Sequence, residues 1–294
     1  MKKIKFAIIG AGKTDNTEDL VQEIKSRGHQ VFLIQLKKLI FEFFNSKYTA
    51  WQENLRLDDL DIFIFRGYNV NIIEAKILAE KLIRENKTVI DEALAKELIP
   101  SKIYESSQFT RNNIPHPKTF QALDFSSYRY IFKKINFPII IKPLYGQKGQ
   151  GIVKADTKKQ AYDFFRKNHK GYLIQEYLKT DSDIRISVVN GKVCGAIKRF
   201  IIPGDFRSNT SLGAKVEKIN LTEEMANLAK RAAKAMKYEI AGVDIIEHGG
   251  RLYVLEVNST PQWQNIKRVT GINLAVYIID YALQKYSSMK KFCL

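Results

Sequence analysis

The chain has 294 residues, of which 45% are hydrophobic and 27% are charged, and its formal net charge at pH 7 is +17. This composition is typical of a globular protein with room for two domains, and it excludes an intrinsically disordered chain. No apolar run approaches the roughly 18 residues that a membrane span requires.

The positive charge favours an acidic partner or substrate. Basic residues are spread along the chain, without the run of roughly 5–8 that is typical of a nucleic-acid patch, so the sequence predicts no nucleic-acid partner. Cys194 and Cys293 form neither a disulfide framework nor a metal-binding spacing, which favours a reducing cytoplasm. A homo-oligomer is compatible with the sequence.

Predicted strands and helices alternate over residues 1–97. Strands are expected at 4–10, 31–36, 61–65 and 88–90, and helices are expected at 17–27 and 73–86. This order predicts a small parallel α/β domain. The first apolar stretch breaks at Gly10, so it is read as a strand and not as a signal peptide.

Two glycine-containing segments of this domain were considered as ligand sites. Gly10-Ala11-Gly12-Lys13-Thr14 has the spacing of neither a P-loop nor a dinucleotide fingerprint, so we expect a structural turn there. Arg66-Gly67-Tyr68 follows a strand end, where open α/β sheets bind ligands. A substrate contact and a purely structural role are equally compatible with this position.

The pattern changes near residue 98, where we place a domain boundary. A predicted helix at 101–112 leads through the extended Ile114-Pro115-His116-Pro117 into a strand, a helix near 125–134 and an apolar strand at 137–143. Lys142-Pro143-Leu144-Tyr145-Gly146-Gln147-Lys148-Gly149-Gln150-Gly151 follows. Because the next segment, 151–154, is also a predicted strand, we expect a hairpin flap, whose glycines permit close approach to an anion and whose lysines supply charge. The alternative is a plain Gly-rich hairpin.

Further polar segments lie downstream of the flap. Gln175-Glu176-Tyr177 ends an apolar strand, and Asp183 and Arg185 are predicted to share one face of the next strand. The loop Asp205-Phe206-Arg207-Ser208-Asn209 carries an arginine that can bind phosphate, although such an arginine is more often a solvated surface residue.

A hairpin near the end of the chain collects oxygen ligands. The strands Gly242-Val243-Asp244-Ile245-Ile246 and Leu252-Tyr253-Val254-Leu255-Glu256-Val257-Asn258 flank a turn with two glycines, which places Asp244 close to opposite Glu256. Asn258 shares the face of Glu256. These ligands favour magnesium or manganese bridging to a nucleotide. The alternative is a set of exposed polar residues on a half-solvated sheet.

Taken in this order, the segments resemble the ATP-grasp superfamily, and within it the RimK-like carboxylate–amine ligases, which include the ribosomal-protein glutamate ligase and related α-L-glutamate ligases. The resemblance covers about residues 98–287, whereas the first 97 residues match only in pattern. It implies an α/β (α+β) fold: an N-terminal domain at 1–97, an ATP-grasp domain at 98–287 with a lid at about 115–178 and a mobile Gly-rich flap, and a C-terminal tail at 288–294.

The resemblance also implies roles for the motif residues. Contacts with the ATP phosphates would come from Lys102, Lys142 and the flap residues Gly146, Lys148, Gly149 and Gly151. Adenine would be read at Glu176 and Tyr177, with Asp183 at the ribose. The phosphates and the reacting carboxylate would also be contacted by Arg207, Ser208 and Asn209. Two magnesium ions, or manganese, would be held by Asp244, Glu256 and Asn258, and the developing oxyanion would be stabilised by Arg185 or Arg207.

The implied function is an ADP-forming ligase that joins a carboxylate to an amine through an acylphosphate. The basic balance of the chain favours an acidic, carboxylate-terminated acceptor, either a protein C-terminus or a glutamate-bearing small molecule. Glutamate or another amino acid is expected as the amine. Two alternatives stay open: an ATP-grasp kinase without ligation, and an ATP-binding regulatory module of the same fold without turnover.

Overall fold

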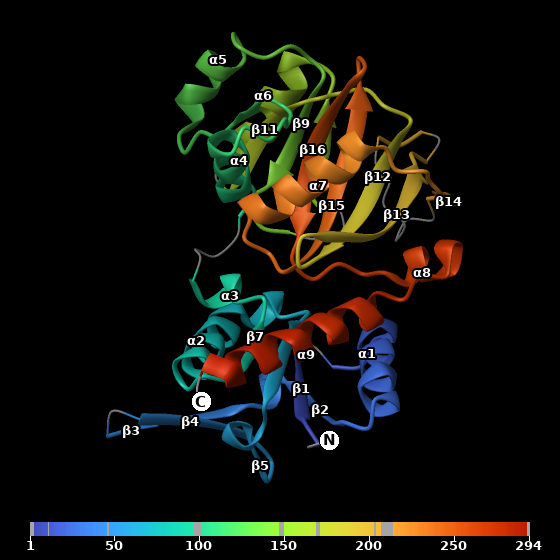
Figure 1. The fold of residues 1–294 in the computed structure, drawn as a ribbon. Helices are drawn as coiled ribbons and strands as arrows, with labels where there is room; N and C mark the ends of the chain where they lie inside the picture. Colours follow the sequence, from blue (N-terminus) through green and yellow to red (C-terminus); the bar gives the residue numbers. More distant parts are fainter. Residues whose placement is uncertain are drawn as a thin grey trace.

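The computed structural model describes residues 3–10, 12–45, 47–96, 101–146, 150–168, 171–202, 204–206 and 214–292 (Figure 1). Lys148, Gly149, Arg207, Ser208 and Asn209, for which roles are predicted above, lie outside these ranges.

The N-terminal part is built on a parallel sheet in the order β2-β1-β6-β7. Its strands are β1 (Lys5–Gly10), β2 (Gln30–Gln35), β6 (Ile62–Arg66) and β7 (Thr88–Ile90). The central strands β1 and β6 are buried on both faces, as parallel strands usually are. One face packs against α1 (Asp15–Ser26) and α9 (Leu274–Phe292), and the other packs against α2 (Ile72–Arg84). This arrangement confirms the predicted parallel α/β unit.

The turn after β1 requires glycine. Gly10 lies beside Arg66 of β6, and a Cβ on Gly10 would lie 1.4 Å from the Arg66 carbonyl oxygen. The Oγ of Thr14 then caps α1 by accepting the N–H of Thr17 at 3.2 Å. These contacts agree with the structural turn predicted for this segment.

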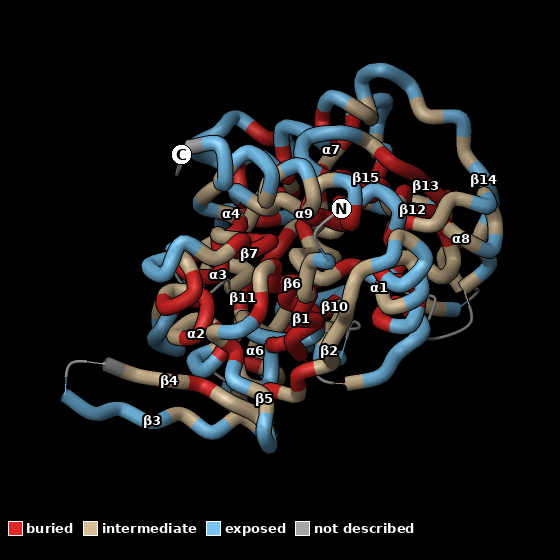
Figure 2. The backbone as a smooth tube through the Cα atoms, turned by 60° about the horizontal axis from the view of Figure 1, so that its bottom comes forward, coloured by how far each residue is buried: buried red, intermediate tan, exposed pale blue. Residues whose placement is uncertain are grey.

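A second sheet of this domain was not predicted. β3 (Ile40–Phe44), β4 (Lys47–Gln52) and β5 (Leu55–Arg56) form an antiparallel sheet that projects from the domain, and β3 is largely exposed (Figures 1 and 2). The apolar residues of β3 do not alternate with polar ones, so the pattern of a half-buried strand is missing.

A four-stranded antiparallel sheet in the order β10-β9-β11-β8 follows the boundary region. It consists of β8 (Thr119–Phe120), β9 (Ile139–Pro143), β10 (Val153–Ala155) and β11 (Tyr172–Glu176). The short α5 (Tyr128–Ile131) and α6 (Lys158–Lys167) pack on it through a cluster of aromatic residues. Since β9 and β10 pair antiparallel, the predicted hairpin between them is confirmed.

The largest sheet runs in the order β14-β13-β12-β15-β16. Its strands are β12 (Ser182–Val189), β13 (Lys192–Phe200), β14 (Val216–Lys218), β15 (Ile240–His248) and β16 (Arg251–Asn258). One face packs against α4 (Lys102–Arg111) and α7 (Glu223–Ala235), and α8 (Gln264–Thr270) packs on β13. The edge of β16 is extended by the Pro115 carbonyl, which accepts the N–H of Val254 at 2.8 Å.

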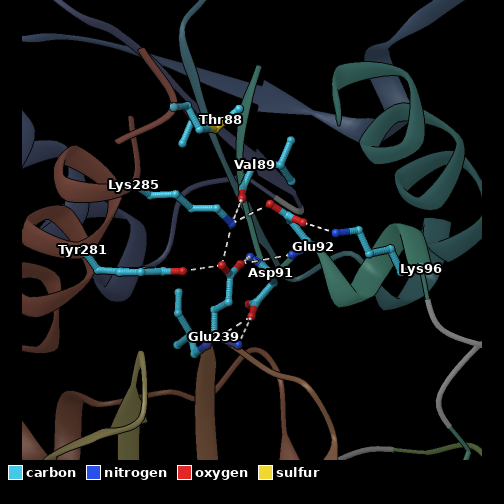
Figure 3. Close-up of polar contacts among 10 residues, drawn as sticks. Thr88, Val89, Asp91, Glu92, Lys96, Glu239, Tyr281 and Lys285 are labelled. Carbon is cyan, nitrogen blue, oxygen red and sulfur yellow. Dashed lines mark hydrogen bonds and ion pairs between the residues drawn. The ribbon is translucent and has the colours of Figure 1, made fainter. Parts of the chain in front are cut away.

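The two halves of the chain meet at a polar junction. α3 (Ala93–Lys96) follows β7, and residues around it contact the start of β15 and the inner face of α9 (Figure 3). α9 thus returns the end of the chain to the N-terminal sheet, as Figure 1 shows. Over the described ranges, no helix is both long and apolar enough to cross a membrane.

Candidate active site

The hairpin β15-β16 brings the predicted oxygen ligands together. Asp244 pairs directly with Glu256, and Gly242 pairs with Asn258. The Nδ2 of Asn258 donates a hydrogen bond to the Oε1 of Glu256 at 2.9 Å, so the two side chains lie on one face of β16 as predicted. Asp244 is only 4% exposed, which argues against a row of solvated polar residues.

Asp244 is held by two arginines. Arg185 lies opposite it on β12 and donates both Nε and Nη2 to the carboxylate, the latter at 2.7 Å. Arg199 on β13 reaches the same carboxylate with Nη2 at 2.9 Å and forks onto Asp183 with two hydrogen bonds of 2.6 Å. Burial acts against the charge on Arg199, but Asp244 and Asp183 together raise its pKa. Two aspartates and two arginines therefore alternate across three neighbouring strands.

Arg199 is absent from the residues predicted to form the site. Its signal in the sequence is the pairing of β12 and β13 around the Asn190-Gly191 turn, which places Arg199 opposite Asp183. A hydrophobic strand that carries a single arginine gives no hint of this role on its own.

Glu256 faces a second group of charges. Lys102, in the first turn of α4, lies with its Nζ 3.2 Å from the Oε2 of Glu256. Burial disfavours a charged Glu256, but Lys102, the hydrogen bond from Asn258 and the neighbouring cations hold the pKa of this carboxyl well below its usual range. Glu256 in turn raises the pKa of Lys102. The ionised carboxylate is thus the state favoured by its surroundings.

Two more buried groups surround this pair. Burial lowers the pKa of Lys142 on β9 to about 8, and Lys102 adds to the effect. Burial raises the pKa of Glu105 on α4 to about 7, although its carboxylate accepts the backbone N–H of Val257. Glu105 therefore fastens α4 to β16, and through α4 it sets the position of Lys102.

A cleft of about 510 Å³ opens beside these residues. Its lining includes Pro117 together with the end of β11 and the segment after it, namely Gln175, Glu176, Tyr177 and Leu178. The carboxylate of Glu176 accepts the N–H of Lys118 at 2.7 Å, and the Glu176 N–H donates to the Lys118 carbonyl at 2.9 Å. These bonds join β11 to the extended link before β8 and give this part of the lining a fixed backbone.

Eight of the eleven predicted residues that the structure describes line this cleft. Its lining includes the predicted residues Lys142, Glu176, Tyr177, Asp183, Arg185, Asp244, Glu256 and Asn258. Lys102 approaches Glu256 from α4. Gly146 and Gly151 lie in the segment between β9 and β10 with positive φ angles of 159° and 72°, and they are not part of the lining.

The segment after β16 was not predicted to take part. The lining of the cleft also includes Thr260, Pro261, Gln262, Gln264 and Asn265, and from the N-terminal domain Asn69. In the sequence this segment only marks the abrupt end of a strand. Its place at the cleft depends on contacts with the N-terminal domain, which strand spacing cannot reveal.

The ligands offered by Asp244, Glu256 and Asn258 suit a hard divalent cation. Two ionised carboxylates and one amide oxygen are the donors that magnesium and manganese prefer. Because the Nδ2 of Asn258 is bonded to Glu256, its Oδ1 is the atom that would face a cation. In the described part of the chain, no cluster of three or more His, Cys, Asp or Glu side chains forms a separate metal site.

Comparisons with known proteins agree with this geometry. A family model described as a RimK-like ATP-grasp domain matches residues 101–282. The chain is 32% identical, over 91% of its length and 96% of the relative's, to a protein of Saccharolobus solfataricus named alpha-aminoadipate–LysW ligase LysX. It is 30% identical to a probable alpha-L-glutamate ligase of Aeromonas salmonicida, over 94% of this chain and 95% of the relative.

Solved structures show the same fold at lower identity. The ATP-grasp ligase PsnB in complex with a minimal precursor has a TM-score of 0.76 and 16% identity, over 97% of this chain and 100% of that chain. A RimK domain ATP-grasp protein from Sphaerobacter thermophilus has a TM-score of 0.73 and 18% identity, over 95% and 99% of the two chains. At this identity the likeness concerns the fold alone.

Proposed function

The chain belongs to the RimK-like ATP-grasp family and is an ATP-grasp C–N ligase, and on this premise we propose that it joins an amino acid to the carboxylate of an acidic acceptor. The observation that carries the proposal is the cluster of Asp244, Glu256 and Asn258 with Lys102 and Lys142, at a cleft whose lining includes Glu176 and Tyr177. The cluster supports the proposal because it brings two lysines that could bind phosphates close to oxygen ligands that suit a divalent cation.

The proposed reaction needs no side-chain nucleophile. The γ-phosphoryl group of ATP passes to an oxygen of the acceptor carboxylate and ADP leaves; the amine then attacks the acyl carbon, inorganic phosphate leaves, and the nitrogen loses a proton. Bound magnesium or manganese would neutralise phosphate charge. The chain's own residues position the reactants and supply positive charge.

The positions of the described side chains support the following proposed roles. Lys102 and Lys142 would bind phosphates, together with the segment that contains Gly146 and Gly151. The nucleoside would lie against Asp183 and the hinge residues Glu176 and Tyr177. Arg185 would stabilise the developing oxyanion. The phosphate contacts predicted for five residues outside the described ranges remain part of the proposal: those of Lys148 and Gly149, between β9 and β10 in the chain, and those of Arg207, Ser208 and Asn209, between β13 and β14.

Two observations support an acidic acceptor and a small amino acid. The net charge of +17 attracts acidic polypeptides, and a relative is named for alpha-aminoadipate and LysW. We therefore propose L-glutamate or alpha-aminoadipate as the amine and an acidic polypeptide C-terminus, or a glutamate-bearing small molecule, as the acceptor.

The test is ADP release from ATP and magnesium with each amino acid, against a panel of acidic peptides and small carboxylates. We expect acceptor-dependent ADP release with a product whose mass equals the two substrates less one water. Glu256→Gln serves as the blank. A phosphorylated acceptor that persists in the presence of the amine would establish a kinase instead, and ATP binding without turnover on any acceptor would favour the regulatory module.

A further inference from the structure

Arg66 is a buried arginine that forms no ion pair with a carboxylate in the described part of the chain. It ends β6 of the N-terminal sheet and is 5% exposed. Over the described ranges no carboxylate lies within ion-pair distance of it, and its Nη1 has no hydrogen-bond partner. Burial lowers the pKa of Arg66 to about 10, against the electrostatic attraction of the buried Asp91, with which it forms no direct ion pair. A buried guanidinium without a direct ion-pair partner is costly, so a specific benefit is expected from its remaining contacts.

Those contacts all reach the segment that follows β16. The Nη2 of Arg66 donates to the carbonyl oxygen of Pro261, and its guanidinium carbon lies 5.1 Å from the centre of the Trp263 ring. Two residues further along the chain, the hydroxyl of Tyr68 is hydrogen-bonded to Ser259 Oγ at 2.9 Å. The end of β6 therefore holds residues 259–263 at three points.

The helix α1 holds the same segment from the other side. Asp19 accepts the indole N–H of Trp263 at 2.9 Å and the side-chain amide of Gln264 at 2.9 Å. Asn16 accepts a second hydrogen bond from the Gln264 amide at 3.0 Å. Trp263 itself is fully buried. The segment is thus seated on the N-terminal domain, although it continues directly from Asn258.

Pro261 links the held segment, residues 259–263, to the charged residues Arg185 and Asp244. A Cβ on Gly242 of β15 would lie 2.6 Å from the Cβ of Pro261 and 3.4 Å from the Cδ of Arg185, so all three groups are in contact around this glycine. Gly242 lies two residues before Asp244, which Arg185 binds. Pro261 and Arg185 therefore pack against the same short stretch of β15, so the position of Pro261 bears on the packing around Arg185 as well as on the wall of the cleft.

We propose that Arg66 is a positioning residue that fixes the cleft wall of Thr260, Pro261 and Gln262, and that this wall receives the amino-acid substrate. The wall offers hydroxyl, carbonyl and amide groups, which suit the ammonium and carboxylate groups of a small amino acid. The inference rests on the proposed function, because it names the place of one of its substrates. The hinge residues Glu176 and Tyr177 make no contact with Arg66, so the nucleotide site should not depend on it.

The test compares Arg66→Lys and Arg66→Met with Arg27→Met. Arg27 pairs with Glu23 and Asp280 in the same domain and does not contact residues 259–263, so its variant controls for a general loss of stability. We expect both Arg66 variants to raise the KM for the amino acid about tenfold or more, with the lysine variant less affected, and to leave the KM for ATP unchanged. A parallel rise of both KM values, or no change in either, would overturn the proposal.

A second readout does not need turnover. In a Trp51→Phe background Trp263 is the remaining tryptophan, so its emission reports on the seating of the segment. Arg66→Met should shift this emission and weaken fluorescence-detected binding of L-glutamate or alpha-aminoadipate, while ADP binding stays at the wild-type level. Unchanged emission and unchanged amino-acid binding would refute the role of Arg66. If the wild-type chain showed no ligation, the proposed function would fail, and this readout would still decide whether Arg66 holds the segment.

Discussion

Asp91 and Glu239 hold each other's backbone across the junction between the two halves of the chain (Figure 3). The Oδ1 of Asp91 accepts the N–H of Glu239 at 2.9 Å, and the carboxylate of Glu239 accepts the N–H of Asp91. Tyr281 and Lys285 of α9 donate to the other oxygen of Glu239. The start of β15, the strand that carries Asp244, is thereby fixed to the N-terminal sheet.

The Asp91 carboxyl should make stability depend on pH between about 4 and 7. Burial, with the neighbouring Glu239, raises the pKa of Asp91 to about 7 from its ordinary 3.8. In this window the folded chain keeps a proton that the unfolded chain has released, so the contribution of Asp91 to stability falls as the pH rises, and it is lost above about 7. Asp91→Asn should remove this part of the slope, as measured by the Tm from pH 4 to 8.

The pH profile of Asp91→Asn must be compared with that of the wild type, because the Glu105 carboxyl also makes stability fall as the pH rises. Its pKa is also raised to about 7 by burial, so the Asn variant should keep a reduced slope and not a flat profile. Equal slopes for the two proteins would show that Asp91 ionises in the folded chain much as it does in the unfolded one.

Glu256→Gln and Asp244→Asn should separate loss of activity from loss of stability. Either change removes charge from the oxygen-ligand group, and we expect ADP release to fall about a hundredfold or more in both. The sequence alone predicts a nearly intact fold for both variants. The structure changes this expectation for Asp244, because Asn there would leave Arg185 and Arg199 buried without their shared carboxylate, a loss of about 3–5 kcal/mol.

Thermal unfolding beside the ADP assay would check this difference. Among the described residues Glu256 forms an ion pair with Lys102 only, and its side chain is one-third exposed, whereas the buried Asp244 pairs with two arginines, so Glu256→Gln should lower the Tm less than Asp244→Asn. Near-normal ADP release in both variants would contradict the assignment of the oxygen ligands, and an equal loss of Tm would contradict the distinction between them.

The parts of the site that the sequence revealed are those in which spacing alone fixes geometry. Glu256 and Asn258 share a face because they lie two apart on one strand, and the Gly-containing turn sets the register that brings Asp244 opposite. Arg199 was not predicted, although the Asn190-Gly191 turn sets a β12-β13 register that places it opposite Asp183, because its ion pair with Asp244 crosses to β15, which is not adjacent to β13. The wall around Pro261 depends on Arg66, which lies 195 positions away in the sequence, and no local pattern reports such a contact.

Salt should weaken the use of an acidic acceptor. The net charge of +17 would accelerate the encounter with an acidic polypeptide, and screening at higher ionic strength removes that attraction. We expect kcat/KM for an acidic peptide acceptor to fall between about 0.05 and 0.5 M salt, whereas a neutral peptide with the same C-terminal residue should change little. Identical salt profiles for the two peptides would refute an acceptor chosen by charge.

Lys142 should make ATP binding sensitive to pH in the alkaline range. Burial and the nearby Lys102 lower the pKa of Lys142 to about 8, so in the free protein its ammonium loses its proton well before that of an ordinary lysine. A neutral Lys142 cannot offset phosphate charge. The Kd for ATP should therefore rise above pH 8, by up to about tenfold per pH unit because one proton is linked to binding.

Lys142→Arg is the matched variant for this prediction, because a guanidinium keeps its charge throughout this range. Its Kd for ATP should be nearly constant from pH 7 to 9.5, even if the larger side chain makes binding weaker overall. For folding the sign is reversed: since the pKa of Lys142 is depressed in the folded chain, the cost of burying it is full below pH 8 and falls progressively as the pH rises from about 8 towards the ordinary lysine pKa of 10.5. The measurement is the slope of log Kd against pH from equilibrium ATP titration, which reports the phosphate contact separately from stability. Equal slopes in the wild type and Lys142→Arg would place Lys142 away from the phosphates.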